Sequence, residues 1–498
     1  MFVNWTHRVR SVLSSALFLT FAFSFFVLAL WSMANPMFGS PDEGRHVVRS
    51  EAAMHWQWGA DVTSRIPMNA GNCFLHKPEV TADCMDLTFD NAAVAAERIP
   101  ASYPPLAHLV YGIPALFLSG VGELYAMRLF GAAFVAACIA VSTQLLLTRW
   151  RRTVVIPIVV LALTPQALLL GSSVNPGGIA NGLSLLLASS LAVNVPRAGR
   201  LVPRWVGVSL VVCLGLFPWV RRDSAILGVL SIGLFAVMVG PNSVREFLRS
   251  RFLQVGLAVF VISSVLARVL FTEGFDTNLL TSTSEAYTSG SFTSIKQLWD
   301  YFRGAIGVFG ALDTPLPLEL ITLGFVVIGA LLLISLAGSQ SWNRLGLAGG
   351  TLLLFVVPVA FSYQRYPYFQ GRYLLPFEIV LVVLAGLAIV RSVKDERFVR
   401  SVLGLLASLM VVLQFFAFAH NLRRYSVGPQ GSWFPGSEAA WQPPWLSVQV
   451  FDALFAVACV IVVAVIFWPQ RLTSSDGGVD EEESEGLGNL NPMRFPEP

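Results

Sequence analysis

The chain has 498 residues, of which 55% are hydrophobic and 13% are charged, and its formal net charge at pH 7 is only +3. Ordinary soluble domains carry about twice this share of charged residues, so the composition excludes a water-soluble globule. Many apolar runs are near the length that crosses hydrocarbon, which predicts an all-α polytopic membrane protein. We therefore expect membrane lipids around it and no nucleic-acid partner.

The first apolar run, Ser11 to Trp31, follows three basic residues and is longer than the apolar core of a signal peptide, so we expect an uncleaved first span. Hydropathy alone indicates about thirteen spans, whereas the placement of basic clusters favours about twelve. The spans are expected at residues 11–34, 123–148, 153–171, 178–195, 204–220, 223–240, 252–271, 318–337, 345–361, 373–391, 399–420 and 446–468.

The two counts differ over the segment from Tyr103 to Leu118, which is short and contains three prolines. Such a segment suits an interfacial or half-inserted helix better than a span. If it does not cross, the basic clusters and both termini face the cytoplasm. Residues 1–470 then form one membrane domain, and residues 471–498, with an acidic run from Asp476 to Glu485, form a disordered cytoplasmic tail.

On this topology the outer face carries three substantial segments, residues 35–122, 272–317 and 421–445. Cys73 and Cys84 both lie in the first of these segments, on the oxidising side of the membrane. We expect them to form a disulfide that closes a small loop.

The stretch from Gly39 to Glu51 opens the longest polar loop between spans. Ser40 fits the N-cap of a helix, Pro41 its first position, and Glu43 the acid of a capping box, so Glu43 has either a capping or a chemical role. Asp42 is not needed by such a cap. An acid one helical turn before His46, where a span meets water, suits proton transfer or metal binding.

Arginines gather at the expected outer ends of spans. The positive-inside rule, by which basic residues favour cytoplasmic loops, does not explain arginines there. Arg222 lies in a turn between two apolar runs, and Arg365 and Arg372 flank an aromatic-rich turn. One interpretation is an interfacial belt in which arginine meets lipid phosphates. The other is bidentate capture of the phosphate of a lipid-linked substrate. If the arginines converge on Asp42, the site has a carboxylate base and cations for a phosphate leaving group.

Two further outer turns are polar. Asn175 lies in the turn Gly171–Gly178, which either only breaks a helix or lines the site. Asp313 precedes an expected span and either caps it or touches substrate.

Six short motifs occur in order between about residue 30 and residue 380, and together they resemble a bacterial family of multi-spanning proteins, domain of unknown function 2142. Gly44 is a departure, because relatives often have Pro or Ala there. The motifs are Ser40-Pro-Asp-Glu43, Tyr103-Pro-Pro-Leu106, Met127-Arg-Leu129, Ser172-Ser-Val-Asn-Pro176, Phe309-Gly-Ala-Leu-Asp-Thr-Pro-Leu-Pro317 and Gln370-Gly-Arg-Tyr-Leu-Leu-Pro376.

This family is in turn similar to the GT-C glycosyltransferases. The resemblance implies a GT-C-like fold of about twelve transmembrane helices with a large first outer loop that contains membrane-parallel helices. It also implies that a sugar moves, with inversion, from a polyprenyl-phosphate donor to a cell-envelope glycan or lipid acceptor, outside a bacterial plasma membrane. These are implications of analogy, because a fold does not fix an activity.

On this resemblance Asp42 is the base, with Glu43 and His46 beside it, and a divalent metal (Mg²⁺ or Mn²⁺) at Asp42 and Glu43 is left open. Arg372, Arg222 and Arg365 are expected to bind the donor phosphate. The residues expected to line the substrate are Tyr103, Asn175, Asp313, Gln370 and Tyr373.

Three alternatives remain: a transporter or flippase of lipid-linked glycans, a glycan polymerase, and a scaffolding membrane protein. Transporters usually show repeated halves and polar or broken helices at mid-membrane. The sequence shows no convincing internal repeat, which weighs against transport. A polymerase shares the outer arginines and the large loop, so the sequence separates it poorly from a transferase.

Overall fold

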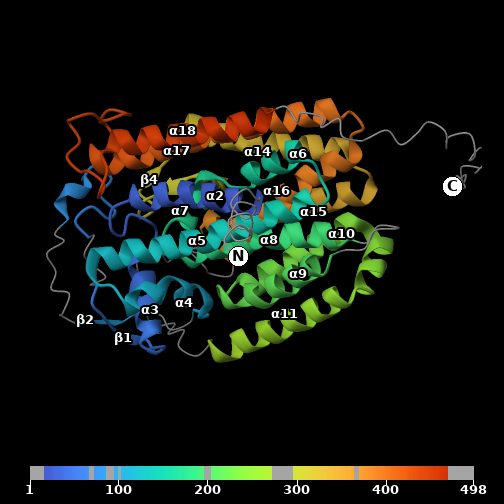
Figure 1. The fold of residues 1–498 in the computed structure, drawn as a ribbon, viewed down its shortest axis with the longest axis horizontal. Coiled ribbons are helices and arrows are strands. Elements are labelled where there is room, and N and C mark those ends of the chain that lie inside the picture. Colours follow the sequence, from blue (N-terminus) through green and yellow to red (C-terminus); the bar gives the residue numbers. More distant parts are fainter. Residues whose placement is uncertain are drawn as a thin grey trace, which may run out of the picture.

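The computed structural model describes residues 16–66, 72–85, 95–98, 103–195, 203–271, 295–363 and 370–468, and all structural statements below concern these residues. Arg365 and the acidic tail lie outside them. The fold is a bundle of long helices (Figure 1), as the apolar runs predict. Ten helices are long and apolar enough to cross a membrane: α2 (Ala16–Met33), α5 (Gly120–Leu147), α8 (Pro176–Asn194), α10 (Ser224–Leu248), α11 (Arg251–Leu270), α14 (Leu318–Gly338), α15 (Ser341–Tyr363), α16 (Leu375–Ser392), α17 (Glu396–Ser426) and α18 (Val448–Phe467).

Two expected spans have a different form. Helices α6 (Arg152–Ala162) and α7 (Pro165–Gly171) together cover one of them, but the pair is bent by 78°. The bend has a local cause, because the Thr164 side chain caps α7 and Pro165 occupies its first turn. Helix α9 (Arg204–Leu216) with η3 (Phe217–Trp219) covers the other, and it is shorter than the ten long helices. By length and composition the described residues therefore give ten spans, or up to eleven if the bent pair is one.

The segment from Tyr103 to Leu118, which decides between twelve and thirteen spans, contains only short helices in the structure. It forms α4 (Leu106–Gly112), which continues as η2 (Ile113–Leu116) around Pro114. Helix α4 packs on α3 (Glu43–Met54) so closely that Gly112 has no room for a Cβ beside the Ser50 carbonyl. A helix of this length cannot cross the hydrocarbon by itself. Figure 1 shows α3, α4 and the strand pair β1 (Asp61–Ser64) and β2 (Ala95–Arg98) together at one end of the bundle.

Thiol labelling tests the twelve-span topology directly. Trp56 is 82% exposed, and the Arg151 side chain is 65% exposed in a surface ion pair whose loss costs little. If residues 104–118 do not cross, an impermeant reagent added outside should label Trp56→Cys and leave Arg151→Cys unlabelled in intact cells. Permeabilised cells supply the control, since both positions should then react. Labelling of both positions in intact cells would establish thirteen spans instead.

Helix α8 lies at the centre of the bundle and is buried over its whole span. The remaining short elements are η1 (Ala82–Cys84), α13 (Ile295–Ile306), the strand pair β3 (Val308–Phe309) and β4 (Thr314–Pro315), and η5 (Gly371–Tyr373).

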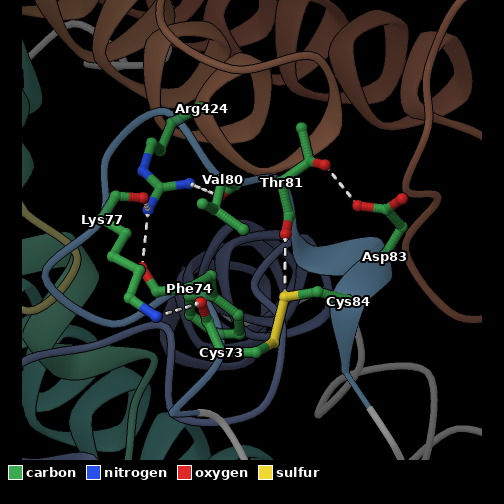
Figure 2. The surroundings of a disulfide bond; sticks show 8 residues. All are labelled: Cys73, Phe74, Lys77, Val80, Thr81, Asp83, Cys84 and Arg424. Carbon is green, nitrogen blue, oxygen red and sulfur yellow. Dashed lines mark hydrogen bonds between the residues drawn. A yellow bond between two sulfur atoms is a disulfide. The ribbon is translucent and has the colours of Figure 1, made fainter.

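The structure has the disulfide between Cys73 and Cys84, with 6.1 Å between the Cα atoms. The disulfide loop, residues 72–85, lies against the end of α17 (Figure 2). Arg424 of α17 donates to the carbonyls of Phe74 and Lys77 at 3.0 and 2.9 Å, and to that of Val80 at 2.5 Å. A buried guanidinium thus connects the first loop to the penultimate long helix.

Candidate functional site

The helix after the first span begins later than the capping pattern predicts. Helix α3 starts at Glu43, and Asp42 is its N-cap residue without a capping hydrogen bond from its side chain. The Ser40 hydroxyl donates instead to Ser173 Oγ at 2.9 Å. The predicted capping box is therefore wrong, because the side chains that it requires bind residues that are distant in the sequence.

Asp42 has an unusual backbone conformation. Its φ of 59° lies in the left-handed region, which few residues other than glycine adopt, although aspartate tolerates it better than most. Such a conformation costs on the order of 1–3 kcal/mol and persists only where the surroundings impose it. The carboxylate of Asp42 makes no capping hydrogen bond to the helix that follows it.

Asp42 forms an ion pair with Arg372 of η5. Arg372 also donates to Gln370 Oε1 at 2.5 Å and to the Pro41 carbonyl at 3.4 Å. Its side chain is only 4% exposed, whereas 45% of the Asp42 side chain is accessible. The structure thus brings together two residues that are 330 positions apart in the sequence. The carboxylate meets solvent on one side and a buried cation on the other.

The charges around Asp42 keep its carboxyl ionised. The surrounding protein desolvates the group and raises its pKa, but Arg372, and after it His46, lower the pKa by more. The net result is a pKa below the usual value of 3.8. At neutral pH Asp42 is therefore an accessible carboxylate, which can accept a hydrogen bond from a hydroxyl group.

His46 lies one helical turn beyond Asp42 in a buried aromatic cluster. Its ring is 5.2 Å from that of Tyr103 and 5.6 Å from that of His108. Burial lowers the pKa of His46 to about 4, so it is neutral at pH 7. Tyr103 thus lies beside α3.

His108 belongs to the same cluster but was not singled out from the sequence. The Ser50 hydroxyl donates its only proton to the His46 carbonyl, so His108 Nδ1 must be the donor in its 3.2 Å contact with Ser50 Oγ. Its Nε2 then carries a lone pair and has no partner among the described residues. Burial holds the pKa of His108 well below its usual value.

A second arginine approaches from the turn between η3 and α10. The Arg221 guanidinium is 5.0 Å from the centre of the Tyr373 ring, and that of Arg372 is 5.5 Å from it. Arg221 also makes a bidentate pair with Asp223, at 2.7 and 2.9 Å. The sequence had indicated Arg222, which is exposed, but its neighbour Arg221 is the one over Tyr373. Sequence alone does not show which of two adjacent arginines faces inward.

Aromatic side chains from three elements meet close to this turn. Phe271, at the end of α11, packs edge-on against Trp219 at 6.3 Å and against Trp58 at 6.0 Å. Trp219 is two residues before Arg221, and Trp58 follows α3. The cationic turn is thus flanked by rings, a combination of apolar faces and charge that suits a ligand with a phosphate beside apolar or sugar groups.

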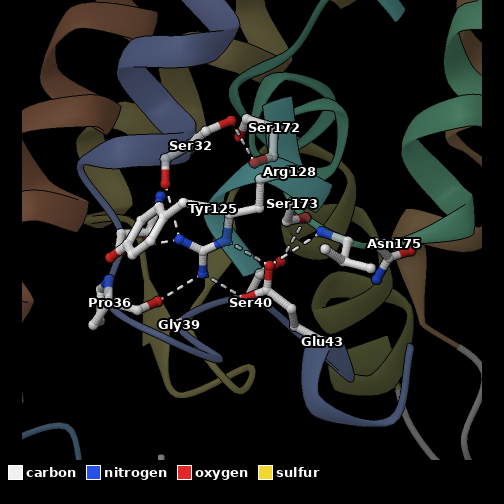
Figure 3. A network of polar contacts seen from close by, with 12 residues as sticks. Ser32, Pro36, Gly39, Ser40, Glu43, Tyr125, Arg128, Ser172, Ser173 and Asn175 are labelled. Atoms are coloured by element: carbon white, nitrogen blue, oxygen red, sulfur yellow. Dashed lines mark hydrogen bonds and ion pairs between the residues drawn. The ribbon is translucent and has the colours of Figure 1, made fainter. Parts of the chain in front are cut away.

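The carboxylate of Glu43 has different partners from that of Asp42, although the two residues are adjacent in sequence. Both of its oxygens accept from Arg128 of α5, at 2.8 and 2.6 Å, and Oε1 also accepts from the Val174 amide at 3.1 Å (Figure 3). Both side chains of the ion pair are 0% exposed. The expectation that Glu43 is catalytic or a metal ligand is therefore corrected, because its carboxylate is buried and fully occupied.

The residues 35–42 that precede α3, here called the site turn, are held from several elements. Its carbonyls accept from side chains of α5, α8, η5 and α17, and Asn421 of α17 donates to the Asn35 side chain at 2.8 Å. The carbonyl contacts are Tyr125 and Arg128 to Asn35, Arg128 to Pro36, Tyr425 to Gly39, and Asn175 and Arg372 to Pro41.

Asn175 both caps α8 and contacts the site turn. Its Oδ1 accepts from the Gly177 amide at 2.9 Å and caps α8, while its Nδ2 donates to the Pro41 carbonyl at 2.9 Å. The Tyr111 hydroxyl donates to the Asn175 carbonyl at 2.8 Å. Asn175 therefore contacts Pro41, the residue before Asp42, and holds the N-terminal end of α8 beside the site turn.

Asp313 belongs to a second network. It is 3.6 Å from Arg424 and accepts from Thr314 Oγ1 at 3.0 Å. The next helix, α14, has Pro317 at its N-cap, so Asp313 does not cap it. The described contacts of Asp313 connect it to the disulfide loop rather than to Asp42.

The residues present do not fit a metal site at Asp42 and Glu43, because the two carboxylates face different arginines. Within the described part of the chain there is no group of three or more His, Cys, Asp and Glu residues that could hold a metal ion.

Comparison with known proteins agrees with a membrane protein. A family model described as "Predicted membrane protein (DUF2142)" matches residues 25–382. The chain is similar to ArnT from Cupriavidus metallidurans bound to undecaprenyl phosphate, with 16% identity, a TM-score of 0.47, and coverage of 89% of this chain and 76% of that one. The same protein in the apo state gives 15% identity, a TM-score of 0.46 and the same coverage. A search of the curated proteins gave no match.

Proposed function

Because the chain belongs to the membrane-protein family DUF2142, we propose a membrane-bound activity for its site. The protein is a glycosyltransferase that moves a sugar from a polyprenyl-phosphate donor to a cell-envelope glycan or lipid acceptor on the outer face. The observation that carries the proposal is the ionised, accessible Asp42 held against the buried Arg372. The six motifs resemble this family, and the similarity of the family to the GT-C glycosyltransferases implies the donor class.

In the proposed reaction, Asp42 accepts the proton of an acceptor hydroxyl group. The hydroxyl oxygen attacks the anomeric carbon from the face opposite the phosphate, so the configuration inverts. The bond between that carbon and the phosphate oxygen breaks, and its electron pair leaves with the lipid phosphate. Arg372 and Arg221, the two cations on the Tyr373 ring, are placed to stabilise that charge.

Neighbouring residues support this division of roles. His46 is neutral at pH 7 and so does not compete with Arg372 for the carboxylate. Arg372 neutralises Asp42 before donor binds, and a donor phosphate that draws Arg372 toward itself would make Asp42 a stronger base. Donor binding would therefore precede proton transfer.

Removal of the Arg372 guanidinium should mainly weaken donor binding. A hydrogen bond to a charged group contributes roughly 1.5–3 kcal/mol, so the KM for donor in Arg372→Ala should rise roughly 10- to 100-fold. Initial rates at varied donor concentration measure this change. Arg222→Ala, which removes the exposed neighbouring arginine, is the comparison and should change KM less. An unchanged KM in Arg372→Ala would remove Arg372 from the donor site.

The test of the function is sugar transfer in membranes of a strain that lacks the protein. Membranes with and without the wild-type chain receive a labelled polyprenyl-phosphate sugar, and label is followed into glycan and lipid. Transfer that requires the chain supports a transferase. Unchanged transfer, together with lipid-linked glycan that accumulates on the inner face of the deletion strain, would indicate a flippase instead.

A further inference from the structure

We infer that Glu43 and Arg128 are a positioning pair that holds Asp42 against Arg372, and that Glu43 takes no part in proton transfer. The inference rests on the proposed function for its consequence in catalysis. Its structural part concerns only where Asp42 is held, and it can be tested without any transfer assay.

Arg128 has no unused hydrogen-bond donor. A guanidinium has five N–H groups. Nε and Nη2 each donate to Glu43, Nη1 donates to the carbonyls of Ser32 and Asn35 at 2.8 Å each, and Nη2 also donates to the Pro36 carbonyl at 2.6 Å. Arg128 thus binds the end of α2, the site turn and the start of α3 at once, as Figure 3 shows.

The backbone at Asp42 is held through both of its neighbours. Asn175 and Arg372 hold the Pro41 carbonyl on one side of Asp42, and Arg128 holds the Glu43 side chain on the other. These contacts on both neighbours favour the left-handed conformation of Asp42 over other conformations. This arrangement directs the Asp42 carboxylate toward Arg372.

Glu43 lacks the access to substrate that a general acid or base requires. A catalytic carboxyl must come within hydrogen-bond distance of the substrate proton. Glu43 is 1% exposed, and both oxygens already accept hydrogen bonds from Arg128. Asp42 is the accessible acid of the two.

The test is an isotope-edited infrared titration of the Asp42 carboxyl in protein reconstituted in lipid nanodiscs, with Asp42→Asn used to identify its band. The charges that act on Asp42 are those of Arg372, His46 and Arg45. The wild-type midpoint should lie below 3.8, the ordinary value. In Glu43→Gln it should rise by about one pH unit, because the carboxylate moves away from Arg372.

Two more variants complete the experiment. Arg128→Lys keeps the buried charge but loses the fork of donors, so it should shift the midpoint in the same direction even if Glu43→Gln folds poorly. Glu51→Gln is the matched control, since Glu51 is also a buried acid of α3 paired with an arginine, Arg65. It should leave the Asp42 midpoint unchanged.

The outcomes separate this inference from the proposed function. An Asp42 midpoint that is the same in Glu43→Gln, Arg128→Lys and wild type would overturn the positioning role. A lost transfer activity in Glu43→Gln with an unshifted midpoint would make Glu43 a direct participant. If the midpoint shifts but Asp42→Asn transfers sugar normally, the positioning pair stands and the base assignment fails.

Discussion

Asp42→Asn should lower the rate of sugar transfer by roughly 100- to 10,000-fold, the usual contribution of a general base. Asparagine has the same shape and can still accept from Arg372, but its amide cannot take the proton of a hydroxyl group. The side chain is 45% exposed, so the substitution should leave the protein folded and inserted. Initial rates, in membranes with matched amounts of each variant, measure the effect.

The control for this result is Glu79→Gln, which neutralises an exposed acid in the disulfide loop. It should transfer at the wild-type rate. The pH dependence adds a check, because Asp42 is a base only while it is ionised. Since its pKa in the protein without donor lies below 3.8, the kcat/KM that depends on Asp42 should fall only as the pH drops through that region. Equal rates for Asp42→Asn and wild type would remove the base assignment.

Arg424→Met should open the disulfide loop without breaking the disulfide. The substitution leaves Asp313, whose side chain is 9% exposed, without its cation and leaves the three loop carbonyls without donors. Loss of one partner of a buried ion pair costs about 3–5 kcal/mol. The loop should therefore populate its open form roughly a hundredfold to a few thousandfold more often.

A glutamate-specific protease measures this opening, because the exposed Glu79 lies within the loop between the two cysteines. Cleavage there should be much faster in Arg424→Met, and the fragments should separate only after reduction, since the disulfide joins them. Arg423→Ala is the matched control, because Arg423 is next to Arg424 but partly exposed and holds one carbonyl, that of Gly431. Equal cleavage rates in Arg424→Met and wild type would show that Arg424 does not hold the loop.

The elements that the sequence predicted well are those whose cause is local. Long apolar runs gave the helices. The bend before α7 was not predicted, because residues 153–171 were expected to form one span. The short Leu106–Leu116 helix follows from its prolines and length. Cys73 and Cys84 were paired because they share one outer loop.

The capping box failed for a reason that no local pattern contains. Ser40 and Glu43 have the right types and spacing, but their partners, Ser173 and Arg128, lie 133 and 85 positions away. A signal for the second partner was present, however. Arg128 is a charged residue inside an apolar run, and such a residue requires an acid from another element.

From the sequence, Asp42 and Arg372 could be named as residues that meet if the outer arginines converge on Asp42. The sequence does not establish that contact, because it depends on how η5 packs against the site turn. Arg221 and Arg222 are adjacent, and the sequence offers nothing to choose between them until the turn after η3 is placed. His108 could have been noticed as a histidine just after the Tyr103-Pro-Pro-Leu106 motif.

The distant contacts of the site turn have a consequence for biosynthesis. The Gly39 carbonyl accepts from Tyr425, which follows it by 386 positions, and the side chain of Asn35 accepts from Asn421. At roughly 5–20 residues per second, translation takes roughly 20–80 s to cover that interval. A nascent chain that ends before Asn421 already carries Asp42, Arg221 and Arg372, but its site turn is not closed. The first loop to leave the ribosome thus gains its last contacts only when nearly the whole membrane domain has been made.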